Sequence, residues 1–356
     1  MFISGDPGLS PFYWFYKNHS KQWRENGLLF SHARGALNYY LHKLHLERGE
    51  EKRAILLPDY ICNDLVCAIE KAGFTVNYYK IGESYNPVIG DVIKNITEKT
   101  LAVMVVHYFG FISPVDELVQ YCGVNDIPII EDCAHVLYNT DIKLRGNASI
   151  FSLKKFFPIP DGGLLVIRDS GIDRDIKAVE RYKMSYRGLS KYFIKYILSH
   201  TNFPIVRSYD DIEHVNKDYS GIKTISMTSE AVLKKYYDIQ YIKRRRRDNF
   251  NYYADAFRKG AESDHKFEMI HDKLRDCDIP YMLPLKLRDD NKTLISHLRK
   301  IGIPAISWPT LPDKIKNAEQ YKTANELLNN TILLPLHQDI AYRHIDHILQ
   351  KFLQII

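Results

Sequence analysis

The sequence has 356 residues, of which 45% are hydrophobic and 26% charged, with a formal net charge of +6. This length and apolar content exclude a disordered chain and are typical of a globular protein with two domains. The small positive charge argues against a dedicated nucleic-acid surface and agrees better with an anionic small-molecule substrate.

The sequence also indicates where the protein acts. No run of 18 apolar residues occurs, so we expect no membrane-spanning helix. The first residues, M-F-I-S-G-D-P-G, lack the positive and apolar regions of a signal peptide. The five cysteines are an odd number without zinc-ligand spacing, so we expect reduced thiols and no metal site in a cytoplasmic protein.

The first predicted helix begins after Ser31, which we expect to be its N-cap. Apolar residues recur at helical spacing from Ala33 to Leu44, and Gly49 ends the helix. Its first turn contains small residues and Arg34, a composition suited to binding a phosphate group.

Strands and helices then alternate toward the middle of the chain. We expect strands at 54–58, 75–79 and 101–106, with helices at 63–71, near Val92 and at 115–122. This alternation predicts an α/β fold with a mostly parallel central sheet sandwiched by helices. Neither G-x-G-x-x-G after the first strand nor a P-loop motif occurs, which disfavours dinucleotide and P-loop folds.

Residues 127–166 contain most polar groups of the candidate site. Three apolar runs, 127–130, 148–153 and 164–167, are predicted to be buried strands. The polar residues at their ends are Asp132, His135, Ser152, Lys155 and the turn Asp161-Gly162-Gly163. Ligands of parallel sheets bind at the carboxyl ends of strands, so we expect these groups to converge. They suit pyridoxal phosphate, which requires a lysine for a covalent bond and an acid opposite its ring nitrogen.

The second half of the chain predicts an insertion, a connecting helix and a small domain. The insertion spans 171–222, and we expect it to pack on a partner subunit; a peripheral membrane contact of its apolar patch is the alternative. One long helix is expected from Ser229 into the basic run 243–247, whose arginines would form a solvated face. We place the large domain at 1–235 and a small α+β domain at 236–356.

The small domain is predicted to alternate between short strands and helices. Its strands are expected at 279–285, 304–308 and 331–335, and its helices at 292–301, at 318–329 and at the end of the chain.

Five motifs resemble a known family. They are V-H-Y-F-G, E-D-C-A-H, F-S-L-K-K with P-D-G-G, R-R-x-N-F and L-P-L-H-Q. Together, over residues 30–345, they resemble the DegT/StrS-type aminotransferases, which are fold-type I pyridoxal-phosphate enzymes acting mostly on nucleotide-linked keto sugars. The resemblance implies a large domain, a small C-terminal α+β domain and a homodimer with the cofactor site at its interface.

The resemblance also implies a role for each candidate residue. Lys155 corresponds to the catalytic lysine that bonds to the cofactor, and Lys154 is the alternative. The implied cofactor-binding residues are Asp132 at the ring nitrogen, His135 beside the 3-hydroxyl, Ser152 with Ala33 and Arg34 at the phosphate, and Tyr60 on the ring face. Cys62, two residues from Tyr60, is the alternative occupant of the ring face.

By the same resemblance, the protein moves an amino group from glutamate or glutamine to a keto sugar, carried on a nucleotide, in amino-sugar or polysaccharide biosynthesis. One alternative is a pyridoxal-phosphate sugar dehydratase, but related dehydratases have His where this chain has Lys155. A second alternative, a non-catalytic ligand- or DNA-binding protein using 243–247, lacks a DNA-reading motif. Basic residues of the insertion, including Arg181, Lys183 and Arg187, are candidates for the substrate diphosphate.

Overall fold

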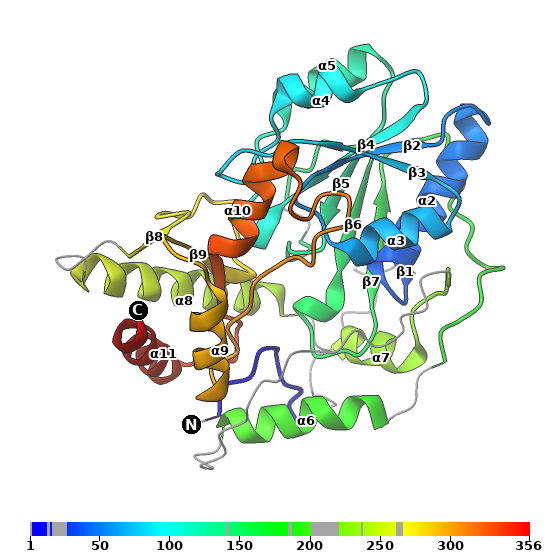
Figure 1. The fold of residues 1–356 in the computed structure, drawn as a ribbon. Helices are drawn as coiled ribbons and strands as arrows, with labels where there is room; N and C mark the ends of the chain where they lie inside the picture. The colour runs from blue at the N-terminus through cyan, green and yellow to red at the C-terminus, as the bar shows by residue number, and fades with distance from the viewer. Residues whose placement is uncertain are drawn as a thin grey trace.

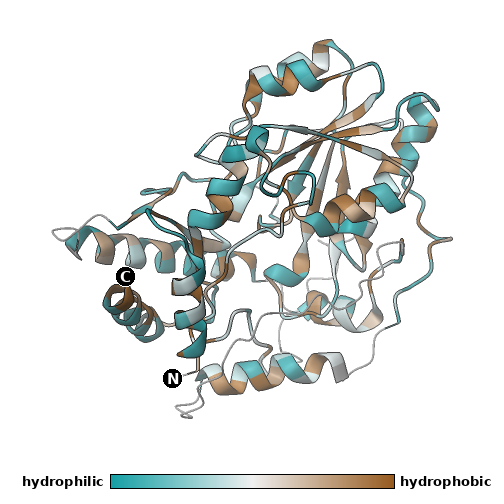
Figure 2. Cartoon of the chain, viewed as in Figure 1, coloured by the Kyte–Doolittle hydropathy of each residue, from teal (hydrophilic) through white to brown (hydrophobic). Residues whose placement is uncertain are grey.

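The protein was analysed as a computed structural model that describes residues 2–12, 15, 27–139, 142–183, 187–200, 221–235, 238–260 and 266–356. Within these residues the chain forms a seven-stranded sheet and a separate three-stranded sheet, each with its own helices (Figure 1). Figure 2 shows apolar residues gathered in the strands of the large sheet, while the surrounding helices carry both hydrophobic and hydrophilic residues.

The large sheet has the strand order β1-β7-β6-β5-β4-β2-β3. Its strands are β1 (Leu28–Phe30), β2 (Ala54–Pro58), β3 (Thr75–Tyr79), β4 (Thr100–Val106), β5 (Ile129–Cys133), β6 (Ala148–Ser152) and β7 (Gly163–Ile167). The pairs from β6 to β3 are parallel, and β7 and β1 add antiparallel pairs at one edge. Every residue of β2, β4 and β6 is buried, as expected for strands covered on both faces. The mostly parallel sheet is confirmed.

Helices cover both faces of the large sheet. These helices are α2 (Ala33–Arg48), α3 (Asn63–Lys71), α4 (Ile89–Asn95) and α5 (Asp116–Val124). Figure 1 shows α4 and α5 on one side of the sheet, and α2 and α3 on the other. The strand order explains this arrangement. The connection from β2 to β3 runs toward one edge of the sheet, and the connection from β3 to β4 runs back in the opposite direction. Because both crossovers are right-handed, their helices lie on opposite faces of the sheet.

The beginning of the large domain differs from the sequence prediction in two respects. The N-cap of α2 is His32, not Ser31, and no side-chain hydrogen bond caps this helix. The Ser31 backbone is instead engaged elsewhere, since its N–H donates to the Lys223 carbonyl at 2.9 Å. The strand β1 was also not predicted; it is only three residues long and is defined by its pairing with β7.

The small domain contains an antiparallel sheet with the order β10-β9-β8. Its elements are α8 (Ile239–Gly260), β8 (Phe267–Met269), β9 (Met282–Leu287), α9 (Lys292–Lys300), α10 (Lys322–Asn330), β10 (Thr331–Pro335) and α11 (Tyr342–Ile355). The expected α+β composition is therefore present. Residues 304–308 do not form the predicted strand, because only Ile306 bridges to Leu333 and the following residues turn toward the large domain.

The long helix expected from Ser229 is wrong. The structure has two helices, α7 (Met227–Lys235) and α8, which begins at Ile239. Asp238 starts the second helix, since its carboxylate accepts the Tyr241 N–H at 2.9 Å, as an N-cap side chain does. The boundary predicted at residue 235 falls between these helices, and the division into domains stays a prediction.

The solvated face expected for the basic run 243–247 is also wrong in part. Arg246 is fully buried. The guanidinium of Arg245 donates to the Ile340 carbonyl, and that of Arg247 donates to the Asp278 carbonyl. Four successive residues of a helix point in all directions, so part of this run necessarily faces the core.

Two parts of the insertion 171–222, residues 184–186 and 201–220, lie outside the described residues. Its described part contains α6 (Arg187–His200), which lies along the N-terminal segment in Figure 1. The Leu9 N–H donates to the Tyr192 carbonyl and joins the two. Among the helices described, none combines the length and apolarity needed to span a bilayer, and all five cysteines are free thiols.

Candidate active site

A cavity of about 180 Å³ lies where the carboxyl ends of β5 and β6 meet the N-terminus of α2. The predicted residues that border it are Ala33, Arg34, Asp132, Ser152, Lys154 and Lys155, together with Cys62. His32, Asp64 and Trp308 also border it. The topology explains this convergence, because β5 and β6 are parallel neighbours whose carboxyl ends share one edge of the sheet.

Lys155 ends the short helical turn η3 (Leu153–Lys155), which follows β6 directly. Burial lowers the pKa of its amine to about 8, because the protonated form loses its water, while the charge of Asp132 acts in the opposite direction. The Lys155 Nζ lies 5.4 Å from the centre of the Tyr281 ring. An amine with this pKa is far more often unprotonated at neutral pH than an ordinary lysine, as a nucleophile must be.

Asp132 lies on β5 and borders the same cavity as Lys155. Burial raises the pKa of its carboxyl group, while the Ala134 N–H and the charge of Lys155 favour the ionised form. The Ala134 N–H donates to Asp132 Oδ1 at 2.8 Å and so fixes the orientation of the carboxylate.

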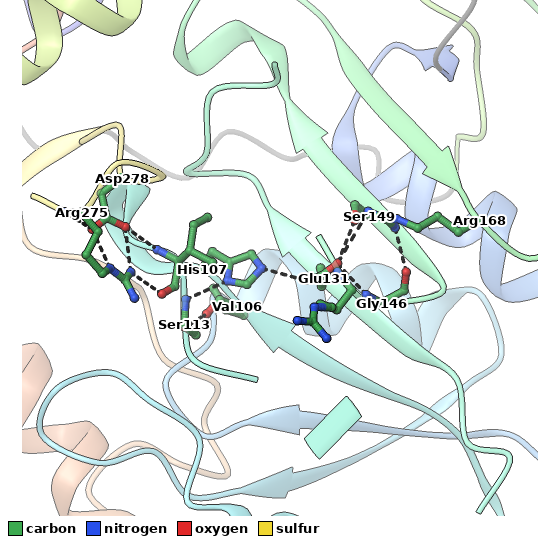
Figure 3. A network of polar contacts seen from close by, with 11 residues as sticks. Val106, His107, Ser113, Glu131, Gly146, Ser149, Arg168, Arg275 and Asp278 are labelled. Atoms are coloured by element: carbon green, nitrogen blue, oxygen red, sulfur yellow. Dashed lines mark hydrogen bonds and ion pairs between the residues drawn. The ribbon is translucent and has the colours of Figure 1, made fainter. Parts of the chain in front are cut away.

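The preceding residue, Glu131, is buried in a polar network beside the site (Figure 3). Its carboxylate accepts hydrogen bonds from His107 Nε2 at 3.3 Å, the Gly146 N–H at 2.8 Å and the Ser149 hydroxyl at 3.2 Å. Arg168 lies 3.7 Å away. Although burial acts to raise it, the pKa of Glu131 is held below its ordinary value by the hydrogen bond from His107 and by the backbone donors.

This network determines the orientation of the His107 ring. Its Nδ1 accepts the Ser113 N–H at 3.1 Å, because a backbone amide can only donate, and its Nε2 donates to Glu131. Glu131 thereby connects β5 to the start of β6 and to the residue that follows β4, and this holds Asp132 in place on the opposite face of β5. Sequence reasoning gave neither Glu131 nor His107 a role; the E-D pair in E-D-C-A-H was the available signal.

The start of α2 forms the other end of the cavity. Ser152, Ala33 and Arg34 border it there. The turn before β7 packs directly on this helix start, since a β-carbon on Gly163 would lie 2.5 Å from the His32 carbonyl carbon and 2.6 Å from the Ala33 nitrogen. Only glycine permits this approach. A hydroxyl, a guanidinium and the N-terminus of a 16-residue helix suit a phosphate group.

Tyr60 and His135 do not border the cavity. Tyr60 is fully buried, and its hydroxyl donates to the Trp308 carbonyl. His135 is buried and its ring stacks on Phe109 and Tyr281, with centroids 5.5 Å and 5.0 Å apart. Burial lowers the pKa of His135 well below its ordinary value, so its ring is neutral. Cys62, the alternative to Tyr60, does border the cavity, and which of the two faces the cofactor ring stays a prediction.

Trp308 is a cavity residue that sequence reasoning missed. It comes from the small-domain segment between α9 and α10, and it is half-buried. Its ring contacts Tyr60, Phe109 and His135 of the large domain, with the closest centroid distance, 4.8 Å, to His135. In the sequence prediction Trp308 lies at the end of a strand of the small domain and is therefore not among the predicted site residues.

The residues around the cavity fit pyridoxal phosphate. They provide a lysine amine of lowered pKa, a carboxylate on the neighbouring strand, and a hydroxyl with a helix N-terminus for a phosphate. These groups belong to four separate elements, and each has the chemistry that one part of this cofactor requires.

Known proteins resemble this chain in sequence and in fold. The model of the DegT/DnrJ/EryC1/StrS aminotransferase family matches residues 26–353. The chain belongs to this family. Membership confirms the resemblance seen in the motifs.

Solved structures share the fold of this family member. PseC of Helicobacter pylori, an aminotransferase involved in the biosynthesis of pseudoaminic acid, superposes with a TM-score of 0.73 at 18% identity, covering 99% of this chain and 98% of PseC. An Escherichia coli GDP-4-keto-6-deoxy-D-mannose-3-dehydratase with bound hydrated PLP superposes with a TM-score of 0.67 at 18% identity, covering 97% and 92% of the two chains. At these identities the likeness confirms fold type I and nothing finer.

Curated relatives match over shorter segments. L-glutamine:scyllo-inosose aminotransferase of Streptomyces griseus is 32% identical over 83 residues, which is 22% of this chain and 20% of the relative. GDP-perosamine synthase of Vibrio cholerae is 28% identical over 138 residues, 37% of each protein. The chain thus matches well under half the length of these relatives.

Proposed function

We propose that this protein is a sugar aminotransferase that moves an amino group from an amino acid, glutamate or glutamine, to the keto group of a nucleotide-linked sugar. The observation that carries the proposal is the pairing of Lys155, whose pKa is about 8, with Asp132 on one cavity. Family membership supports amino transfer, and the names of the relatives support a sugar or cyclitol ketone as acceptor.

Each side chain has a defined task in this reaction. Bound pyridoxal phosphate supplies an electron sink for the carbon that gains or loses nitrogen. Asp132 would hold a proton on the ring nitrogen of the cofactor, and its own orientation is fixed by the Ala134 N–H. The Lys155 amine would hold the cofactor covalently and would be the group that carries a proton to or from the substrate carbon. Ser152, Arg34 and the N-terminus of α2 would hold the phosphate.

The substrate nucleotide rests on less direct support. GDP-perosamine synthase names a nucleotide sugar, whereas scyllo-inosose is a free cyclitol. The first relative matches 37% of this chain at 28% identity and the second 22% at 32% identity, so neither decides the substrate. Of the candidate basic residues, Arg181 pairs with Glu230 at 2.7 Å and so is already neutralised in part. Lys183 is exposed, and the side chain of Arg187 lies outside the described residues. A diphosphate site formed by this segment remains part of the proposal.

A second candidate is a pyridoxal-phosphate sugar dehydratase, and the dehydratase of the same fold supports it. Retention of lysine at position 155 favours amino transfer, since a histidine there could not bond covalently to the cofactor. We further propose a cytoplasmic homodimer; the free state of all five cysteines supports a reducing compartment.

A donor and acceptor screen tests the proposed function. The protein is loaded with pyridoxal phosphate and incubated with glutamate or glutamine and with keto sugars linked to UDP, GDP or dTDP, or with a free keto-cyclitol. Mass spectrometry should show an acceptor whose carbonyl oxygen is replaced by an amino group. Loss of a hydroxyl without gain of nitrogen would assign the dehydratase reaction instead, and amination of only the free cyclitol would remove the nucleotide from the proposal.

A further inference from the structure

The buried Arg246 of α8 binds three groups of the domain junction. Its Nη1 donates to the carbonyl oxygens of Pro280 at 3.1 Å and Tyr281 at 2.9 Å, and its Nε donates to Gln338 Oε1 at 3.2 Å. The guanidinium also lies 4.6 Å from the centre of the Phe156 ring. None of the described ion pairs gives Arg246 a carboxylate partner. Burying a charge without a counter-charge is costly, so a core that merely needed filling would favour an apolar side chain here.

Gln338 extends this contact to the turn that carries Lys155. Its Nε2 donates to the Phe156 carbonyl at 2.9 Å. The Arg246 guanidinium can only donate and the Phe156 carbonyl can only accept. The Gln338 amide therefore has its oxygen toward Arg246 and its nitrogen toward Phe156. The amide therefore joins the arginine of the small-domain helix α8 to the backbone of the large domain.

Two residues that contact Arg246, Phe156 and Tyr281, lie next to Lys155. Phe156 follows Lys155 in the chain, and its N–H closes the turn by donating to the Leu153 carbonyl at 3.0 Å. The ring of Tyr281, whose carbonyl Arg246 binds, lies 5.4 Å from the Lys155 Nζ and stacks on His135. Two hydrogen-bonded routes thus lead from one buried guanidinium to two neighbours of the same lysine, Phe156 and Tyr281.

We propose that Arg246 and Gln338 are positioning residues that hold the Lys155 turn and the Tyr281 ring in place, so that the small domain keeps water away from the reactive amine. This inference rests on the proposed role of Lys155 in binding pyridoxal phosphate. The R-R-x-N-F and L-P-L-H-Q motifs then have a shared task, since Arg246 belongs to the first and Gln338 to the second.

The proposal predicts a measurable change at Lys155. The groups acting on its amine are Asp132 on β5, Cys62 before α3 and Lys154 in its own turn, with the Tyr281 ring packed beside it. If the turn loosens while these groups remain, water reaches the amine and its pKa rises from about 8 toward the value of an ordinary lysine. Each unit of increase lowers the unprotonated fraction at pH 7, and with it the rate of bonding to the cofactor, about tenfold.

The experiment measures cofactor capture by the apoenzyme. The full-length protein is freed of cofactor and mixed with pyridoxal phosphate between pH 6 and pH 9, and the absorbance of the bound cofactor is followed with time. The rate of each variant is divided by that of the wild type at the same pH, which cancels the ionisation of the cofactor itself. The variants are Gln338→Met, which removes both amide hydrogen bonds, and Arg246→Lys, which keeps the charge but loses the planar fork.

Asn249→Ala is the matched control. Asn249 is buried on the same helix and donates to the carbonyl oxygens of Leu336 and His337, in the same loop as Gln338, yet it has no described contact with the Lys155 turn. Thermal unfolding is recorded for every variant. We expect Gln338→Met and Arg246→Lys to slow capture at least about tenfold below pH 8 and to approach the wild-type rate at higher pH. Asn249→Ala should lower the unfolding temperature without changing the pH profile.

Three results would count against the inference. An unchanged pH profile of cofactor capture in Gln338→Met would overturn it. So would an equal change of that profile in Asn249→Ala. A slowing of capture in Gln338→Met that is the same at every pH would also overturn it. If Arg246→Lys fails to fold, Gln338→Met decides the question. Failure of the proposed function is distinguishable, because in that case borohydride would not attach the cofactor to Lys155 even in the wild type.

Discussion

At the scale of single residues, the Lys155 amine is the group on which the proposed chemistry depends. With a pKa of about 8, roughly a tenth of it is unprotonated at pH 7, against less than about a thousandth for an ordinary lysine. Burial produces this shift by disfavouring the charged form, and Asp132 limits it. The amine is therefore reactive near neutral pH, and its protonated form is still favoured by the charge of Asp132.

The first prediction concerns which lysine bonds to the cofactor. Borohydride reduction of the loaded protein, followed by peptide mapping, should place the label on Lys155. Lys155→Ala should abolish turnover and labelling while retaining the fold, and Lys154→Ala should keep both within about tenfold, because the lowered pKa and the ring contact belong to Lys155. A label on Lys154 would reverse this assignment.

The second prediction concerns Asp132. Asp132→Asn should lower turnover about a hundredfold or more, because a neutral amide does not hold a proton on the ring nitrogen. It should also move the midpoint of cofactor capture to lower pH, since the Asp132 charge raises the pKa of Lys155 and its removal leaves burial unopposed.

Asp64→Asn is the control for this variant, because Asp64 borders the same cavity but is not among the charges that act on Lys155. An upward movement of the midpoint in Asp132→Asn, or an equal movement in Asp64→Asn, would be inconsistent with the assigned role. Turnover close to that of the wild type would remove Asp132 from the site.

At the scale of elements, the segment between α9 and α10 connects the small domain to the cavity. Trp308 is its contribution, and its ring packs among aromatic side chains of the large domain. Trp308→Ala should weaken cofactor binding about tenfold or more, as loss of an aromatic wall typically does, whereas Trp308→Phe should stay within a few-fold of the wild type. Equilibrium dialysis with thermal unfolding as a folding check measures this; equal loss in both variants would indicate a purely structural role.

A glycine in the turn after β4 allows the two domains to approach. Gly110 has φ +95°, and a β-carbon there would lie 2.1 Å from the Ile279 carbonyl oxygen. Gly110→Ala should therefore lower the free energy of unfolding by at least about 2 kcal/mol in urea titrations. Gly123→Ala, in α5 with no atom near the new methyl group, should instead raise it by about 0.5–1 kcal/mol. Similar effects of both substitutions would contradict the close approach.

At the scale of the whole molecule, four of the exposed apolar side chains lie on the N-terminal segment and α6. Phe12 and Phe15 are 67% and 86% exposed, and Ile194 and Ile197 are 56% and 47% exposed. The backbone bond between Leu9 and Tyr192 joins the two segments. Apolar groups concentrated in this way are typical of an interface, which agrees with the homodimer proposed for this protein.

Light scattering at micromolar concentration should therefore give twice the mass of one chain. Ile194→Asp combined with Ile197→Asp should weaken association at least about tenfold, because a charged group loses its hydration when an interface forms. Val124→Asp, at a residue 83% exposed on α5, is the control and should leave the mass unchanged. An active monomeric wild type would refute the dimer, and an unaffected double variant would refute this surface.

The regular elements show how far local sequence information extends. The strands β2, β3 and β10 and the helix α3 have the bounds that their apolar runs and flanking glycines predict. Local pattern suffices there because the whole length of each run is apolar or amphipathic. It did not suffice for β1, which depends on pairing with β7, more than a hundred residues away, or for the predicted strand at 304–308.

By itself, then, the sequence determined the parallel α/β architecture and the family, and it predicted a lysine and an aspartate that border one cavity, because strand periodicity and motif order are local properties of the chain. Only the tertiary structure decided which side chains surround these two residues. Cys62 and Trp308 border the cavity while Tyr60 does not, and Glu131 and Arg246 lie in buried polar networks. Such roles depend on contacts between distant residues, as between Arg246 and Gln338, which are 92 positions apart. Burial and hydrogen-bond partners arise only when the chain has folded.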